Sequence, residues 1–232
     1  MDFKNSGKMK AVTFSFDDGI VQDYRMIELL NKYGLKATFN LSSGLFGKSD
    51  VLWLFNKRLC HYYVHADRVK CTYEGHEVAA HGVHHPHLAW QDADEIVAEV
   101  EGDRLALSEL VGYEVVGLAY PFGSVDDRVE KVLRERTGIK YARQTPLTSS
   151  FDVPQNLMRL NGTMHMIRFD EMMDLGRKFI ELETEEPKIF YVWGHCYEMD
   201  YESENWCRME EFFKLIAGHD DIYYGTNKDV LL

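Results

Sequence analysis

Two short motifs carry side chains that bind metals and move protons, each at a point where a strand is expected to end. The first reads FDDG and carries adjacent carboxylates, Asp17 and Asp18, after a short apolar run. The second reads HGVHHP, residues 81–86, and carries His81 and His85 four positions apart. One helical turn of backbone puts residues i and i+4 on the same face, so both imidazoles can reach one divalent ion together with a carboxylate. The remaining aspartate suggests hydrolysis rather than a purely structural metal.

The two aspartates are expected to have different roles. At the end of a strand their side chains leave in different directions, so one can bind the ion while the other faces the substrate. A His, His, Asp set leaves positions open for water and a substrate oxygen, which is typical of a catalytic ion. We expect Asp18 to be the ligand and Asp17 to take a proton from water as general base. The structural alternative is that an aspartate here only caps a helix.

Two further segments offer groups that amide hydrolysis needs. The apolar run IFYVWG ends at His195, which can protonate a leaving amine, although a buried histidine bonded to backbone is the alternative. The turn that begins at Tyr120 offers backbone N–H groups to an oxyanion, and Phe122 is the natural donor because Pro121 has no N–H. Trp193 flanks the histidine and is expected to line the pocket.

Strands and helices are expected to alternate along the chain. Apolar and β-branched runs predict strands at residues 10–16, 36–41, 77–80, 115–120, 140–143, 156–160, 189–193 and 221–224. Periodic patterns predict helices at residues 21–33, 92–111, 126–137, 169–182 and 204–217. This alternation predicts one α/β domain over residues 1–232, with parallel strands and outer helices. Six or more units indicate a barrel, and a doubly wound open sheet is the alternative; either collects chemistry at the carboxyl ends of the strands.

One stretch gives no clear pattern. Residues 45–75 are expected to be irregular and aromatic-rich, and they carry His61 and His65, again four positions apart. No strand is expected before this pair, and no partner carboxylate is identified for it. We therefore interpret it as a surface or lid segment rather than a second metal site.

The charge balance excludes several partners. Asp and Glu number 38 against 26 Lys and Arg, which gives a formal charge of −12. An acidic chain of this kind is a poor binder of nucleic acid or of anionic membranes, both of which attract basic patches. No run approaches the ~20 apolar residues of a membrane span, and no signal peptide is visible. We expect a cytoplasmic protein, and its oligomeric state is left open.

At these residues the chain resembles the polysaccharide deacetylases, which have the NodB-type fold of carbohydrate esterase family four. The resemblance runs from Thr13 to about His195 in the family's motif order, through SFDDG, HGVHHP, AYPFG and WGHCYE. It implies a distorted (β/α) barrel of about seven parallel strands. It also implies one divalent ion, zinc first and cobalt, manganese or nickel otherwise. The residues implied are Asp17 as base, His195 as acid, and Asp18, His81 and His85 as ligands.

The chain departs from the family pattern in its supporting residues. The family's third motif begins with an arginine that holds the base, and Ala119 stands there instead. Arg143 and Arg159 are the two candidates to replace it. The aspartate that orients the catalytic histidine in the family is echoed only by Asp152, and the hydroxyl residue of the second motif is Gly82.

The sequence therefore predicts a metal-dependent hydrolase that removes acetyl groups from N-acetylated sugars or oligosaccharides. One alternative is hydrolysis of another C–N or ester bond in a small metabolite. The other is a catalytically inactive relic that binds carbohydrate or metal. The sequence does not decide the substrate, N- against O-deacetylation, or the metal.

Overall fold

A parallel barrel forms around the first strand, β1 (Lys10–Asp18), in the computed structural model, which describes residues 2–54 and 56–232. Its strands follow the order β8–β7–β6–β5–β2–β1–β10–β9, and every pair is parallel. The remaining barrel strands are β2 (Ala37–Leu41), β5 (Glu77–Ala80), β6 (Gly117–Ala119), β7 (Tyr141–Leu147), β8 (Leu160–Gly162), β9 (Met164–His165) and β10 (Lys188–His195). A further strand, β11 (Ile222–Tyr224), pairs with the first residues of β1.

The sheet closes on itself through one segment. β8 pairs with β7 and β9 pairs with β10, and only Thr163 separates these two pieces. The Thr163 N–H donates to the carbonyl of Tyr191 in β10 at 2.8 Å. Residues 160–165 therefore act as one staggered strand between β7 and β10. The distorted barrel of about seven parallel strands is confirmed, and the open-sheet alternative is wrong.

The wall of the barrel is buried on both faces, and outward and inward side chains of β1 differ in polarity. All nine residues of β1 are buried, as expected for a parallel strand covered on both sides. Phe14 points outward and packs edge-on against Phe212 and Phe213 of an outer helix, with ring centroids 6.4 and 5.2 Å apart. The alternate positions, Ser15 and Asp17, point inward and take part in hydrogen bonds. The larger apolar core thus lies between wall and helices, whereas the barrel interior combines these polar side chains with a smaller apolar cluster that includes Ala11, Ile189 and Tyr191.

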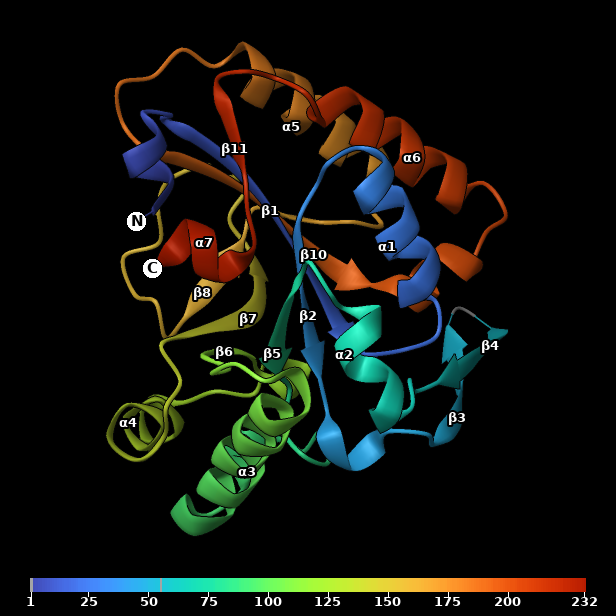
Figure 1. The fold of residues 1–232 in the computed structure, drawn as a ribbon, viewed down its shortest axis with the longest axis vertical. Helices are drawn as coiled ribbons and strands as arrows, with labels where there is room; N and C mark the ends of the chain where they lie inside the picture. Colours follow the sequence, from blue (N-terminus) through green and yellow to red (C-terminus); the bar gives the residue numbers. More distant parts are fainter. Residues whose placement is uncertain (1, 55) are drawn as a thin grey trace.

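Helices cover the outside of the barrel (Figure 1). α5 and α6 run along one side, and α3 and α4 along another. The best-defined start is that of α3, where the Asp92 side chain accepts from the N–H groups of Asp94 and Glu95 in a capping box. These helices are α1 (Asp23–Lys32), α2 (Val69–Thr72), α3 (Ala93–Val111), α4 (Asp127–Arg136), α5 (Phe169–Glu181) and α6 (Asn205–Ile216). In the described ranges no helix combines the length and apolar character needed to cross a membrane.

A short helix, α7 (Asn227–Leu231), plugs the amino-terminal end of the barrel, where the chain's two ends lie side by side (Figure 1). The Asn227 side chain accepts from Thr13 at 2.9 Å and donates to Tyr191 at 2.6 Å. The Lys228 N–H donates to the buried carboxylate of Glu77 at 2.9 Å. These bonds satisfy polar groups inside the barrel and leave the carboxyl-terminal end for the pocket.

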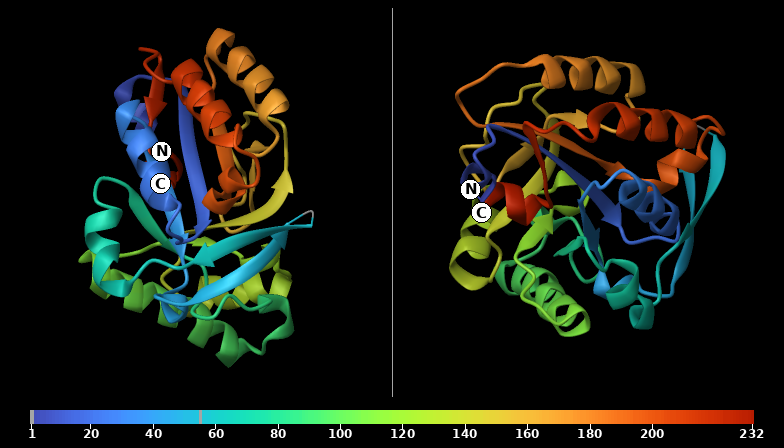
Figure 2. Two further views of the ribbon diagram at one scale, coloured as in Figure 1. Left: turned by 90° about the vertical axis from the view of Figure 1, so that its right-hand side faces the viewer. Right: turned by 45° about the horizontal axis from the view of Figure 1, so that its top comes forward.

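A β-hairpin stands at the other end of the molecule, far from α7 (Figure 2). Its antiparallel strands, β3 (Ser49–Leu54) and β4 (Lys57–Tyr62), fall in residues 45–75, so the expectation of irregular structure there is wrong. The hairpin is tied down at its base, where the Val21 N–H donates to the Tyr62 carbonyl at 2.9 Å. Farther along, Lys57 donates to the Tyr201 carbonyl. It therefore spans the barrel rim from β1 to the segment after β10.

Candidate metal centre and catalytic pocket

The motif residues meet in one cavity of about 420 Å³ at the carboxyl ends of the barrel strands. Asp17 and Asp18 end β1, His81 follows β5, the Tyr120 turn follows β6, and His195 ends β10. The cavity is lined by Asp17, Asp18, Asp50, Leu52, His61, Tyr63, His81, His85, Tyr120, Phe122, Thr145, Trp193, His195 and Tyr197. Segments predicted separately from the sequence are thus brought to one rim.

Asp18, His81 and His85 present three ligand atoms to one point. The Asp18 Oδ1 lies 3.6 Å from the His81 Nε2 and 3.8 Å from the His85 Nε2, and the two Nε2 atoms are 3.1 Å apart. The His81 Nδ1 is 2.7 Å from the Ala119 carbonyl, which can only accept, so Nδ1 carries the proton and Nε2 offers its lone pair. Lone pairs that converge in this way without enough donors fit a divalent cation.

The backbone holds several of these residues in the left-handed region. Asp18 has φ of 82°, His85 of 57° and Phe122 of 58°, and none of them is glycine. Such conformations cost on the order of 1–3 kcal/mol each and persist where the surrounding structure imposes them. Strained backbone therefore gathers in this pocket, which is typical of a functional site.

Helix α3 clamps the histidine loop. The buried Asp103 carboxylate accepts from the His81 N–H at 2.9 Å and from the Ser43 N–H at 2.7 Å. One turn earlier, Glu99 accepts from the His84 N–H at 2.8 Å. Gly82, which replaces the family's hydroxyl residue, has φ of 76° and lies between these clamps. The two carboxylates thus support the loop in which that hydroxyl is missing.

Asp17 is buried and paired with Arg143. One guanidinium nitrogen, Nη2, lies 2.5 and 2.6 Å from the two carboxylate oxygens, and Asn40 donates to Oδ1 at 2.8 Å. Burial raises the pKa of the Asp17 carboxyl, but the charges of Arg143, His81 and His195 outweigh it, and the pKa is lowered overall. Asp17 therefore stays ionised and able to accept a proton.

The structure decides which arginine lies beside Asp17. Arg143 is 1% exposed, and its guanidinium stacks over the Trp193 ring at 4.3 Å. Arg159 instead pairs with Asp127 and Glu130 on α4, each at 2.6 Å. Trp193 lines the cavity as expected, and its packing also fixes the arginine that holds Asp17.

His195 faces Asp17 across the pocket. Its Nε2 lies 3.9 Å from the Asp17 Oδ2, and its Nδ1 lies 3.5 Å from the Glu198 Oε1. Burial lowers the pKa of His195, but Glu198 and the two aspartates outweigh burial and raise it to about 9. The imidazole is therefore protonated at neutral pH and suited to give a proton.

Asp152 does not orient His195. Its carboxylate is exposed and accepts from Lys188 at 2.8 Å, and Lys188 stands at the opposite end of β10 from His195. Seven residues of strand separate those ends by roughly 23 Å at about 3.3 Å per residue. The suggestion that Asp152 corresponds to the family's orienting aspartate is thus wrong.

The two predicted residues of the turn after β6, Tyr120 and Phe122, lie in different surroundings. The Tyr120 side chain is 1% exposed and its hydroxyl donates to the Met158 carbonyl at 2.9 Å, so it anchors the turn. Phe122 is 57% exposed at the mouth of the cavity, and its ring stacks on that of His87 with centroids 4.0 Å apart. The assignment of the Phe122 N–H as oxyanion donor stays a prediction.

His61 is the main residue that the sequence analysis misjudged. It is 3% exposed rather than at the surface, and its Nε2 lies 3.2 Å from the Asp18 Oδ2. Its ring packs against Tyr63 and Tyr197. The hairpin brings it there, since inward Leu59 and His61 alternate with exposed residues on β4. The sequence of β4, KRLCHY, has apolar residues on both faces and so gave no signal of this burial; His65, by contrast, is exposed.

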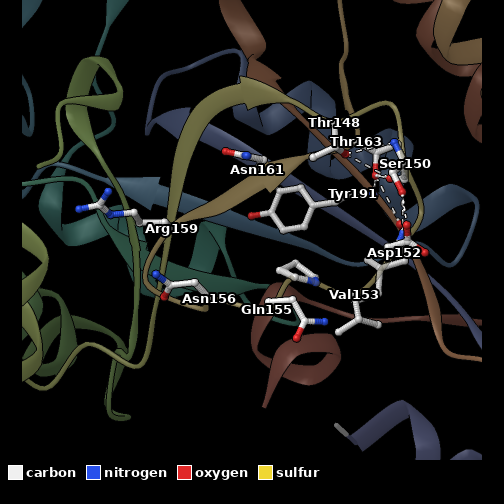
Figure 3. Close-up of a pocket in the computed structure, with 12 residues that line it drawn as sticks. Thr148, Ser150, Asp152, Val153, Gln155, Asn156, Arg159, Asn161, Thr163 and Tyr191 are labelled. Carbon is white, nitrogen blue, oxygen red and sulfur yellow. Dashed lines mark hydrogen bonds between the residues drawn. The ribbon is translucent and has the colours of Figure 1, made fainter. Parts of the chain in front are cut away.

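A second cavity, of about 310 Å³, lies beside β8 and β10 away from the histidines (Figure 3). It is lined by hydroxyl and amide side chains such as Thr148, Ser150 and Asn161, with the Tyr191 ring across its middle. Its carboxylate, Asp152, is already bound to Lys188. The chemistry of hydrolysis therefore collects in the first cavity.

Comparison with known proteins agrees with this geometry. The family model described as polysaccharide deacetylase matches residues 4–142, more than half of the chain. The chain belongs to the polysaccharide deacetylase family. Membership supports a hydrolase, and the matched residues include both motifs of the metal centre. No curated protein matches the chain significantly.

Several solved structures share the fold of this polysaccharide deacetylase family member. The deacetylase PplD of Streptococcus pyogenes, in complex with acetate, is 23% identical with a TM-score of 0.54, and the match covers 63% of this chain and 61% of that one. A family 4 carbohydrate esterase of Streptomyces lividans is 15% identical with a TM-score of 0.56, covering 93% and 91%. Puue allantoinase is 13% identical with a TM-score of 0.73, covering 97% and 89%.

These likenesses concern the fold. The match spans only about three fifths of the Streptococcus protein and 44% of a polysaccharide deacetylase from Bacillus cereus. The same fold is shared by BA3943 of Bacillus anthracis, which is described as a pseudoenzyme. The activity of the present chain therefore has to be argued from its own residues.

Proposed function

We propose that this protein is a metal-dependent hydrolase that removes acetyl groups from N-acetylated sugars or short oligosaccharides. The observation that carries the proposal is that one pocket joins a metal-ligand set to a buried carboxylate and a protonated imidazole. Membership of the polysaccharide deacetylase family supports the reaction class. Deacetylation of an amide needs an activated water, a base and an acid, and each has a candidate here.

Asp18, His81 and His85 would hold one divalent ion, with zinc as the first candidate and cobalt, manganese or nickel as alternatives. Bound there, the ion would supply a Lewis acid for the acyl carbonyl and lower the pKa of water. The donor set favours no single metal, because imidazole and carboxylate ligands accept several.

The chain's own residues supply the proton transfers. Asp17, kept ionised by Arg143, takes a proton from the attacking water. His195 gives a proton to the departing amine; its Nε2 lies 3.9 Å from the Asp17 Oδ2, so both groups reach the same substrate. The Phe122 N–H is the proposed donor to the oxyanion, and its strained backbone fits such a fixed orientation.

The pocket's walls favour a small substrate or the end of a chain. Asp50, Leu52 and His61 of the hairpin close one side, and Phe122 stands at the mouth. About 420 Å³ lies within the usual range for small-molecule sites, about 300–1,000 Å³. The same closure supports the second candidate, hydrolysis of a C–N or ester bond in a small metabolite.

The inactive-relic alternative loses its main argument. It depended on the missing arginine of the third motif, and Arg143 now occupies the position beside Asp17. Base, acid and ligand candidates all lie in one cavity. We therefore rank catalysis above mere binding.

The test is acetate release from a panel of N- and O-acetylated sugars, from monomers to oligomers, with simple amides and esters alongside. The protein is stripped with a chelator, and zinc, cobalt, manganese and nickel are each added back. We expect metal-restored release that is strongest on N-acetylated monomers or short oligomers. Turnover of simple amides or esters alone would favour the metabolite hydrolase. Metal binding without any turnover, with ligand binding intact in Asp17→Asn, would favour the relic.

A further inference from the structure

The buried carboxylate of Glu198 lies between two histidines at the back of the pocket. Its Oε1 is 3.5 Å from the His195 Nδ1 and 3.6 Å from the His165 Nε2. Its Oε2 accepts from the backbone N–H of His195 at 3.1 Å. Glu198 is 7% exposed, so these contacts are made away from bulk water.

Separate parts of the barrel hold this arrangement. Glu198 lies on the 3₁₀ turn η6 (Cys196–Asp200) directly after β10, and Asn205 of α6 donates to its carbonyl at 2.9 Å. His165 ends β9 and packs edge-on against Trp193, with ring centroids 4.4 Å apart. The position of the carboxylate is therefore set by the fold rather than by a mobile loop.

The carboxylate depends on the two imidazoles. Burial raises the pKa of Glu198, but the hydrogen bond and charge of His195 outweigh it and lower the pKa overall. Within residues 2–54 and 56–232, the only ion-pair partners found for Glu198 are His195 and His165. A buried anion with no arginine or lysine partner is stable only while such contacts persist.

We propose that Glu198, backed by His165, is the positioning residue that fixes the ring and tautomer of His195. This role falls to aspartate in the family, and Asp152 cannot fill it because it lies at the far end of β10. With its Nδ1 3.5 Å from the Glu198 Oε1, the His195 ring turns its Nε2 toward Asp17 and the pocket, as an acid that serves the substrate must. The catalytic consequence rests on the proposed function, whereas the orientation does not.

One competing interpretation uses the same atoms. His165, His195 and Glu198 offer three ligand atoms within 4.8 Å of one another, which also suits a metal ion. An ion there would occupy the Nδ1 of His195 and leave it without the proton that the positioning role requires. The two interpretations therefore predict different spectra and different metal contents.

The experiment combines imidazole NMR with kinetics on the full chain. Long-range ¹H–¹⁵N spectra give the tautomer and pKa of His195 in the parent, in Glu198→Gln and in His165→Asn, with Glu204→Gln as the exposed-carboxylate control. Glutamine keeps the size of the side chain and an acceptor for the His195 N–H, so the fold is expected to survive. Metal content and the pH profile are measured on the same samples.

In the parent we expect a protonated Nδ1 and a His195 pKa well above that of an ordinary histidine. In Glu198→Gln we expect that pKa to fall, kcat to drop about 10- to 100-fold with KM unchanged, and the basic limb of the pH profile to move to lower pH. His165→Asn should give the same changes to a smaller extent, and Glu204→Gln none.

Two results would overturn the inference. The first is a His195 pKa that is ordinary in the parent, or that does not change in Glu198→Gln. Both pKa values can be measured even if no acetylated substrate is turned over. The second is a second metal equivalent that disappears in Glu198→Gln, which would assign the three residues to an ion. Failure of the proposed function alone would remove the kinetic effects and leave the NMR result standing.

Discussion

At the scale of single residues, different contacts give two adjacent aspartates different chemistry. Asp17 and Asp18 are neighbours in sequence, yet Arg143 and Asn40 hold the first, while His81 and His85 face the second. The pKa of Asp17 is lowered because cationic neighbours outweigh its burial. The difference in chemistry therefore comes from partners supplied by distant strands.

Variants of Arg143 and Arg159 test whether the arginine beside Asp17 supports its role as base. Arg143→Met removes the partner of a buried carboxylate, so we expect kcat to fall about 10- to 100-fold while metal content is kept. Some loss of stability is expected as well, because the Asp17 charge is left buried and unpaired. Arg159→Met removes only surface ion pairs on α4 and should leave the rate unchanged. Full activity in the Arg143 variant would show that the base needs no such support.

His61 and His65 provide a second pair. Because the His61 Nε2 contacts the Asp18 oxygen that faces away from His81 and His85, its removal should loosen that ligand. We expect His61→Phe to weaken zinc binding by about 10- to 100-fold in calorimetric titration. His65→Phe alters an exposed ring and should bind zinc like the parent. Equal affinities in the two variants would remove His61 from the account.

At the scale of elements, α3 and the hairpin position residues that lie on other segments. Asp103 of α3 ties the histidine loop to the turn after β2 by accepting from the N–H groups of His81 and Ser43. The hairpin in turn carries His61 and one wall of the pocket. The metal centre therefore depends on elements that contribute none of its three ligands.

Asp103→Leu tests the clamp. The substitution leaves the Ser43 N–H without its acceptor, whereas the His81 N–H keeps its second acceptor, the Leu41 carbonyl at 2.9 Å. An unsatisfied buried donor costs roughly 1–3 kcal/mol, and the contact with His81 is lost as well. We expect the free energy of unfolding in urea to fall by about 2 kcal/mol or more, with weaker zinc binding. Glu109→Leu, an exposed position on the same helix, is the control. If both variants unfold at the same urea concentration as the parent, the clamp contributes nothing.

The hairpin's effect on substrate size can be measured separately. Replacing residues 51–60 by a two-residue Asn-Gly turn removes the pocket wall formed by Leu52 and leaves the strands of the barrel untouched. Because His61 remains in the chain, zinc binding serves as the control. We expect relative kcat/KM to move from monomers toward longer oligomers. An unchanged length preference would show that the wall does not select size.

At the scale of the whole molecule, the pattern of the sequence predicted the barrel and the position of the motif residues at the carboxyl ends of its strands, because strand–helix alternation and buried β-branched runs are local signals. The strand at 77–80 and the helices near 92–111 and 126–137 agree with β5, α3 and α4. What escaped prediction was set by distant contacts. The strands predicted at residues 115–120 and 156–160 are in fact the three-residue strands β6 (Gly117–Ala119) and β8 (Leu160–Gly162). The hairpin at residues 49–62 was not predicted, and most side chains of its strand β4 are exposed. Arg143 was one of two candidates for the position beside Asp17, but the choice between them, and the contact of His195 with Glu198, depend on the folded structure.

Stability should also depend on pH through a buried acid of the fold. Burial raises the pKa of Asp23 from 3.8 to about 7, since it outweighs the hydrogen bonds from Cys196, Tyr73 and Ile20. The native state then binds more protons than the unfolded state between about pH 4 and 7, so this group's contribution to stability falls as pH rises through that window. Asp23→Asn cannot ionise, so its stability relative to the parent should increase from pH 4 to 7 and then level off. A difference independent of pH, in urea unfolding series, would contradict this assignment.

Metal binding and proton transfer are assigned to different aspartates of one motif, Asp18 and Asp17, and the two functions can be measured on the same samples. Zinc content and acetate release are determined together for the parent, Asp17→Asn and Asp18→Asn after identical metal loading. We expect Asp17→Asn to keep one equivalent of zinc and to lose activity by several orders of magnitude, and Asp18→Asn to lose the zinc itself. Loss of zinc in Asp17→Asn, or full zinc binding in Asp18→Asn, would contradict these roles.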